Sequence, residues 1–148
     1  MTVSTSACAT PRLTAWLCRH AVVSTGVDTA ISLQSNGSIT VRSGATVENS
    51  AAGPAIGLYG TGVNTVEFLH NNTLTIEQGA QVLSKGTTSD AEAVNPLGTG
   101  NTIINHGTIE LAAGGINVTG TLENSGTLRA KGQSSVSAGG TFINSGTL

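Results

Sequence analysis

Near-copies of one short phrase recur toward the C-terminal end of the chain, and this repetition restricts the fold more than any other feature. The copies are GNTIINHGTI (100–109), GTLENSGTL (120–128) and GTFINSGTL (140–148). They align on Asn105, Asn124 and Asn144, at spacings of 19 and 20 residues. A threonine and an apolar residue precede each asparagine, and Gly, Thr and a second apolar residue follow it. Six positions therefore agree in chemical type in all three copies, which identifies a repeat.

The phrase also extends toward the N-terminus, with a longer spacing. SLQSNGSIT (32–40) and FLHNNTLTI (68–76) fit it and place Gly37 and Asn72 at its glycine position. Asn is the residue other than Gly that most readily adopts a positive φ. We therefore predict a sharp left-handed corner at this position. The intervals of 35 residues between positions 37, 72 and 107 leave two alternatives open, two tight coils or one coil that carries a loop.

The segments between the corners are typical of short β-strands. SITV, TLTI and GTIEL are β-branched and alternating, and Gly, Asn or Ser bounds them. A unit of about 20 residues made of such segments cannot bury its own apolar face, so it must stack on a neighbour. Like residues then lie above one another, about 4.8 Å apart, and the asparagine amides can bond along the stack. The sequence predicts an all-β protein, a right-handed parallel β-helix (solenoid) of roughly five or six rungs.

The composition agrees with this class and argues against a nucleic-acid partner. Charged residues make up 9% of the chain, against roughly 25% in an ordinary globular protein. The formal net charge is −2, and the sequence has no basic stripe. We therefore expect no nucleic-acid partner.

The first 26 residues lie outside the repeat, so we divide the chain into a head, 1–26, and a repeat array, 27–148. Thr10 and Pro11 match the start of a helix, and one apolar helical face would then hold Leu13, Trp16, Leu17 and Ala21. A short helix and a disordered segment both remain open for this head. Arg19 and His20 interrupt its apolar run, which argues against a secretory signal peptide.

Two cysteines, Cys8 and Cys18, occur in the head, and no second Cys or His pair follows at a zinc spacing. We expect two incidental thiols, with a disulfide that closes the head as the alternative. At the other end, the last copy stops within the phrase without a polar cap. We expect a fragment of a longer array, truncated at the C-terminal end and open to end-to-end self-association.

The repeats resemble the passenger-domain repeats of bacterial autotransporters, the pertactin-like type V secreted proteins. The likeness rests on GNTIINHGTIEL, GTLENSGTLRA and GTFINSGTL, with GAQVLSKG before them, and it covers roughly residues 32–148. Filamentous-haemagglutinin-type exoproteins use a similar phrase. The resemblance implies a β-helix on the cell surface or outer membrane, or secreted, commonly serving adhesion and virulence through a host surface protein or glycan. The C-terminal translocator barrel of that family is missing from this chain.

No arrangement in the sequence predicts a catalytic, cofactor or metal site. Asp90 and Glu92 are close in sequence but fall in a predicted loop, whereas glycoside hydrolysis needs two carboxylates that flank one cleft. The histidines, His20, His70 and His106, are far apart, although the last two could meet at a corner. The other acids are Asp28, Glu48, Glu67, Glu77, Glu110 and Glu123. Two of them, Glu48 and Glu123, are expected on outward strand positions, where water solvates them.

We therefore expect a non-enzymatic structural and adhesion stalk with no cofactor. A ligand surface would fall on the longer loops, predicted at Ala51–Gly62 and Lys85–Gly100, since loops on rigid scaffolds carry binding. Two alternatives remain open: a β-helix polysaccharide-processing enzyme, and a vestigial truncated reading frame. Asn36, Asn71 and Asn117 begin N-x-S/T triplets, which an Asn- and Thr-rich chain contains by accident.

Overall fold

The computed structural model describes residues 8–12, 15–25, 29–34, 36–59, 71–88, 91–96, 99–131 and 136–148. Every regular element in these ranges is a β-strand. The described residues therefore contain no helix of the length and apolarity that crossing a bilayer requires. The chain is an all-β protein, as the strand pattern of the sequence predicted.

The strands form three faces. The first face holds β1 (Cys8–Arg12), β2 (Ala15–Cys18), β5 (Ser38–Val41), β8 (Thr73–Ile76), β11 (Thr102–Asn105), β14 (Thr121–Asn124) and β17 (Thr141–Asn144). The second face holds β3 (Val22–Ser24), β6 (Thr46–Asn49), β9 (Gln81–Ser84), β12 (Thr108–Leu111) and β15 (Thr127–Ala130). The third face holds β4 (Ile31–Gln34), β7 (Ile56–Tyr59) and β10 (Val94–Pro96), followed by β13 (Ile116–Val118) and β16 (Val136–Ala138).

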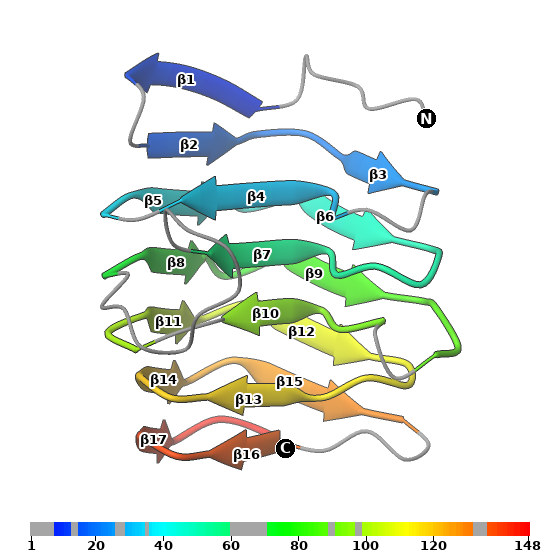
Figure 1. Cartoon of the computed structure of the whole chain (residues 1–148). Helices are drawn as coiled ribbons and strands as arrows, with labels where there is room; N and C mark the ends of the chain where they lie inside the picture. The colour runs from blue at the N-terminus through cyan, green and yellow to red at the C-terminus, as the bar shows by residue number, and fades with distance from the viewer. Residues whose placement is uncertain are drawn as a thin grey trace.

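Each turn of the chain contributes one strand to each face, and successive turns stack in sequence order (Figure 1). All pairs in the three faces are parallel except β1 with β2, which is antiparallel. The chain coils in a right-handed sense from the N-terminal to the C-terminal end (Figure 1). The molecule is therefore the parallel β-helix that the repeat predicted.

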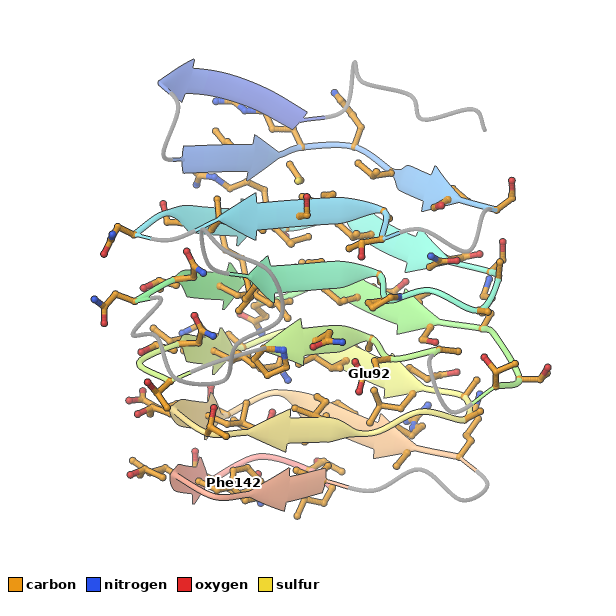
Figure 2. The ribbon with its side chains drawn as sticks, viewed as in Figure 1. Glu92 and Phe142 are labelled. Atoms are coloured by element: carbon orange, nitrogen blue, oxygen red, sulfur yellow. The ribbon has the colours of Figure 1, made fainter. Side chains whose placement is uncertain are left out.

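The core is a set of apolar files that run along the axis inside the coil. The first face contributes one file of completely buried side chains, Ile39, Leu74, Ile103 and Leu122. Phe142 continues this file in the last turn, where it is partly buried against the core (Figure 2). Alternation along each short strand turns one side chain inward and the next outward. Stacking then converts a weak pattern in each turn into one continuous core.

The described part of the head forms strands that belong to the stack, so the short helix that was one of the two alternatives for the head is not formed there. β2 pairs with β5 and β3 pairs with β6, so the first turn of the coil begins within residues 1–26. Backbone hydrogen bonds from β2 and β3 to the next turn stabilise the strands more than the helical pattern of residues 13–21 stabilises a helix. Leu13 of that pattern lies outside the described residues.

The cysteines are also not incidental thiols. Cys18 is disulfide-bonded, and the sequence has one other cysteine, Cys8. Cys8 lies opposite Cys18 in the antiparallel pair of β1 with β2. The alternative of a disulfide that closes the head is therefore confirmed, and the expectation of two free thiols is corrected.

The predicted asparagine file is confirmed. Asn105 Nδ2 donates to Asn124 Oδ1 at 2.7 Å, and Asn124 Nδ2 donates to Asn144 Oδ1 at 2.7 Å. Asn105 Oδ1 also accepts from Gly107 N at 3.1 Å, which closes the short corner between β11 and β12. In the two preceding turns four residues form this corner, 42–45 and 77–80, and the apolar Val41 and Ile76 take the place of the asparagine. The asparagine therefore accompanies the shorter corner.

The alignment of the upstream copies with the downstream ones is wrong by one corner. Gly37 N donates to Asn72 Oδ1 at 3.1 Å, and Asn72 N donates to Asn101 Oδ1 at 3.2 Å, so these three share a corner before the first face. Gly107 precedes the second face instead, at the level of Ala80. The register of a strand depends on its partner in space, and the corners differ in length between turns. The spacing in the sequence therefore assigned Gly37 and Asn72 to the corner of Gly107, which is the wrong corner.

The reason for the repeated glycines also differs from the prediction. Among the described residues, positive φ occurs at Asn36, Asn71, Gly44, Gly79 and Gly100. The glycines of the phrase are needed because there is no room for a side chain. A Cβ added to Gly107 would lie 2.5 Å from the carbonyl oxygens of Glu77 and Ala80, in the turn above.

The open question of the 35-residue intervals is settled for the first one. Gly37 and Asn72 are bonded neighbours along the axis, so their interval is one coil with additional residues. The additional residues fall between β7 and β8, where 60–70 are not described. The predicted loops contain strands as well: β7 lies within 51–62, and β10 lies within 85–100.

Candidate functional site

A row of polar side chains follows the corner between the first and second faces. Its members immediately follow the first-face strands of successive turns: Arg19, Arg42, Glu77, His106, Ser125 and Ser145. We call this set the corner row. Because the parallel register places equivalent residues one above another, the six side chains run along the axis of the coil.

Backbone hydrogen bonds fix the corner row at each step. Arg42 N donates to Cys18 O at 3.0 Å, and Glu77 N donates to Val41 O at 2.9 Å. The amides of the next three members continue the ladder at 2.8–2.9 Å, through His106, Ser125 and Ser145. The members of the row are therefore joined by the backbone hydrogen bonds between successive turns, and they are spaced like neighbouring strands of a sheet, about 4.8 Å apart.

Two adjoining open depressions lie along this row. Arg19, Arg42, Ser43 and Glu77 line the first. Glu77, Gln78, His106 and Ser125 line the second. Glu77 lines both, so the two depressions adjoin at this residue, and polar side chains line each of them. We call the two depressions together the corner groove.

Charge is distributed unevenly in the corner groove. Glu77 Oε1 lies 3.1 Å from Arg42 Nη1, and Glu77 Oε2 accepts from Ser43 N at 3.1 Å. Both carboxylate oxygens therefore face the turn above Glu77. Arg19 lies one turn beyond Arg42 and is exposed. The groove carries positive charge at its Arg19 end, and at its other end His106 and Ser125 offer hydrogen-bond donors and acceptors.

His106 and Ser125 form the second polar contact of the groove. His106 Nδ1 lies 2.6 Å from Ser125 Oγ. A serine, a histidine and an acid in one groove suggest a catalytic triad, which requires the acid to orient the histidine. Here both oxygens of Glu77 contact Arg42 and Ser43 instead. The arrangement therefore suits hydrogen bonding to a ligand better than nucleophilic catalysis.

The predicted acid and histidine candidates are not gathered at one place. Asp90 and His70 lie outside the described residues, so neither the Asp90–Glu92 pair nor a meeting of His70 with His106 is tested. Glu92 lies on the segment that leads into β10, at a different corner from the corner groove (Figure 2). Within the described part of the chain, no group of three or more His, Cys, Asp or Glu residues could hold a metal ion.

The other described acids are mostly in surface ion pairs on the second face. Glu48 Oε2 lies 2.8 Å from Lys85 Nζ. Glu110 contacts Lys131, and its other oxygen lies 3.9 Å from Arg129 Nη1. Glu123 is exposed on the first face. Asp28 and Glu67 belong to ranges that the structure does not describe.

Sequence reasoning missed the corner row. Its members are 23 to 35 residues apart at the N-terminal end and differ in chemistry, so no repeat of residue type marks them. One signal was available: each of the three aligned asparagines is followed by His or Ser, which makes that position polar in every copy. Extending that position to Glu77, Arg42 and Arg19 requires the register.

The fold and the groove define a parallel β-helix repeat protein with a polar groove along one corner. Comparison with protein-family models, with curated proteins and with solved structures found no match.

Proposed function

We propose that this protein is a non-enzymatic structural and adhesion stalk, part of a surface-exposed or secreted passenger of the autotransporter type. The repeated N-x-G-T phrase supports the family assignment through its resemblance to passenger repeats. The parallel β-helix supports it as well, because a stalk of this kind needs a stiff rod that grows by adding identical turns.

The disulfide of Cys18 supports a location outside the cytoplasm. Disulfides persist in oxidising compartments, such as the periplasm and the cell surface, and are rare in the reducing cytosol. The bond connects β1 to β2 at the N-terminal end of the coil. There it secures an antiparallel strand that covers the ladder of the first turn, where an open edge would otherwise invite pairing.

One observation carries the proposal: the corner row stands on an uninterrupted backbone ladder from Arg42 to Ser145. The backbone beneath these side chains is already ordered, so binding an extended ligand along the row requires no ordering of the main chain. The partner expected from the resemblance is a host surface protein or a glycan. The polar lining of the corner groove favours the glycan.

The test is adhesion by the purified 148-residue protein. Beads coated with the protein should attach to cultured host cells or to an immobilised glycan panel, and beads coated with the unfolded, reduced protein should not. The same panel in solution tests the alternative of a polysaccharide-processing enzyme. New reducing ends or unsaturated products would refute the non-enzymatic proposal, and equal attachment of folded and unfolded protein would refute the adhesive one.

A further inference from the structure

We propose that the Arg19 end of the corner groove binds the carboxylate of an acidic polysaccharide, while the rest of the groove binds the sugar hydroxyls. This inference rests on the proposed surface-binding function and names its ligand class.

Arg19 and Arg42 are neighbours along the axis. They follow β2 and β5, and Cys18 lies directly beside Val41 in the register of these strands. Arg42 N donates to Cys18 O at 3.0 Å, which holds the two residues one turn apart. Both side chains are exposed, and both line the same depression with Ser43 and Glu77. The two arginines therefore line one open depression.

The charges at this end do not cancel. Four of the basic side chains that the structure describes have a carboxylate within ion-pair distance, namely Arg42, Lys85, Arg129 and Lys131. Within the described part of the chain, Arg19 has no such carboxylate. In the described lining of this depression Glu77 is the one carboxylate, and it contacts Arg42. Among the described groups the charge of Arg19 is therefore not balanced, so an anion that bridges Arg19 and Arg42 would relieve their repulsion.

The chemistry of arginine favours a carboxylate. A guanidinium presents several N–H donors in a planar fork, and this fork matches the two oxygens of a carboxylate. Arg42 is already oriented, because its Nη1 contacts Glu77 Oε1 and the other oxygen of Glu77 accepts from Ser43 N. A ligand carboxylate would therefore meet one oriented guanidinium and one free to adjust.

The remainder of the corner groove favours an acidic sugar chain over a nucleic acid. Beyond Arg42 the lining consists of Glu77, Gln78, His106 and Ser125, which donate and accept hydrogen bonds without net positive charge. A nucleic acid would offer mainly phosphates and bases to the residues beyond Arg42. A uronic-acid polysaccharide carries hydroxyl groups beside its carboxylate on each sugar, so it can place one carboxylate at Arg19 and hydroxyls against Gln78, His106 and Ser125.

The test measures binding of the full 148-residue protein to immobilised polysaccharides at low ionic strength. Polygalacturonate supplies carboxylates, dextran sulfate supplies sulfates, and dextran is neutral. We expect polygalacturonate to bind most tightly. R19Q should weaken that binding by about tenfold, as expected for hydrogen bonds to a charged group. The matched control K85Q removes a cation from the second face and should change the affinity by less than about twofold.

Substitution of Glu77 should change the affinity in the opposite direction to R19Q. E77Q removes the negative charge that neutralises Arg42 but keeps an amide oxygen that can still accept from Arg42, so Arg42 stays oriented and the binding of polygalacturonate should become several-fold tighter. A variant that only damaged the fold would weaken binding, so this gain cannot come from misfolding. Equal effects of R19Q and K85Q, or weaker binding by E77Q, would overturn the proposal. Dextran sulfate that binds as tightly as polygalacturonate would overturn the carboxylate assignment.

The same measurements separate this inference from the proposed function. If polygalacturonate binding depends on Arg19 but coated beads fail to attach to cells or glycans, the ligand site is supported and the adhesive role is refuted. If beads coated with the wild-type protein attach and beads coated with R19Q attach equally well, the adhesive role is supported and the Arg19 site is refuted.

Discussion

The glycine of the repeated phrase offers the sharpest test of how the turns are packed. Gly107 and Gly44 occupy equivalent corners of different turns but are needed for different reasons. A Cβ on Gly107 would lie 2.5 Å from two carbonyl oxygens of the turn above. A Cβ on Gly44 would meet nothing within 4 Å, but its φ is 79°, in the left-handed region. Replacing each by alanine therefore separates the cost of close approach from that of an unfavourable φ.

The structure sets the size of each effect. Ordinary contact begins at 3.4 Å, so the Cβ of G107A is too close by about 0.9 Å. Separating the turns by that amount would lengthen the bond from Thr108 N to Ala80 O from 2.9 Å to about 3.8 Å, beyond hydrogen-bond range. The bond from His106 N to Ile76 O, at 2.8 Å, would be strained as well. We expect G107A to lower the free energy of unfolding by about 2–4 kcal/mol and G44A by about 1–2 kcal/mol.

Urea unfolding followed by circular dichroism measures both values, compared at an unchanged m-value. The m-value matters because a repeat array can lose a few turns before the rest. Hydrogen exchange at the amides of His106 and Thr108 would show whether the ladder opens at the substituted corner. If G44A costs as much as G107A or more, then φ is the dominant requirement, and the close-packing explanation of the repeated glycines is refuted.

Three further outcomes follow from the same structure. C8A, or reduction of the wild-type chain, should lower the free energy of unfolding by about 2–3 kcal/mol, because the bond closes a short loop; an unchanged urea midpoint would contradict this. N124A should lower the free energy of unfolding by about 2–3 kcal/mol in the same assay, since the side chain of Asn124 hydrogen-bonds to Asn105 and Asn144 at 2.7 Å each. The control Q78A, at an exposed turn residue, should lower it by less than about 0.5 kcal/mol. K85A should change stability by less than about 1 kcal/mol, because the Lys85 side chain is 58% exposed and its ion pair with Glu48 remains in contact with water. A larger loss would show that the ion pair is structural.

The downstream copies show why part of the fold could be predicted from sequence. Asn105, Asn124 and Asn144 are 19 and 20 residues apart in sequence and bonded side chain to side chain. In these turns the corners have nearly constant length, so the period of the sequence equals the period in space. The strand pattern and the apolar file through Ile103 and Leu122 follow from the same regularity.

The upstream turns show the limit of that reasoning. Intervals between bonded neighbours are 35 residues from Gly37 to Asn72 and 29 from Asn72 to Asn101. With additional residues of different lengths, the best local match to the phrase put Gly37 beside Gly107, at the wrong corner. The helical pattern of the head failed for a related reason, since a short segment takes the conformation that its neighbour in space can pair with.

The sequence by itself determined the class of this protein, because alternation, corner residues and a repeated phrase admit only strands that stack turn upon turn. Only the tertiary structure decided which residues share a corner, that Cys8 and Cys18 belong together, and that Arg19, Arg42 and Glu77 line one groove. The physical reason is that the backbone ladder sets the register, while the loops absorb any difference in length between turns. Neighbours along the axis are therefore fixed by hydrogen bonds, whose partners the spacing in the chain does not reveal.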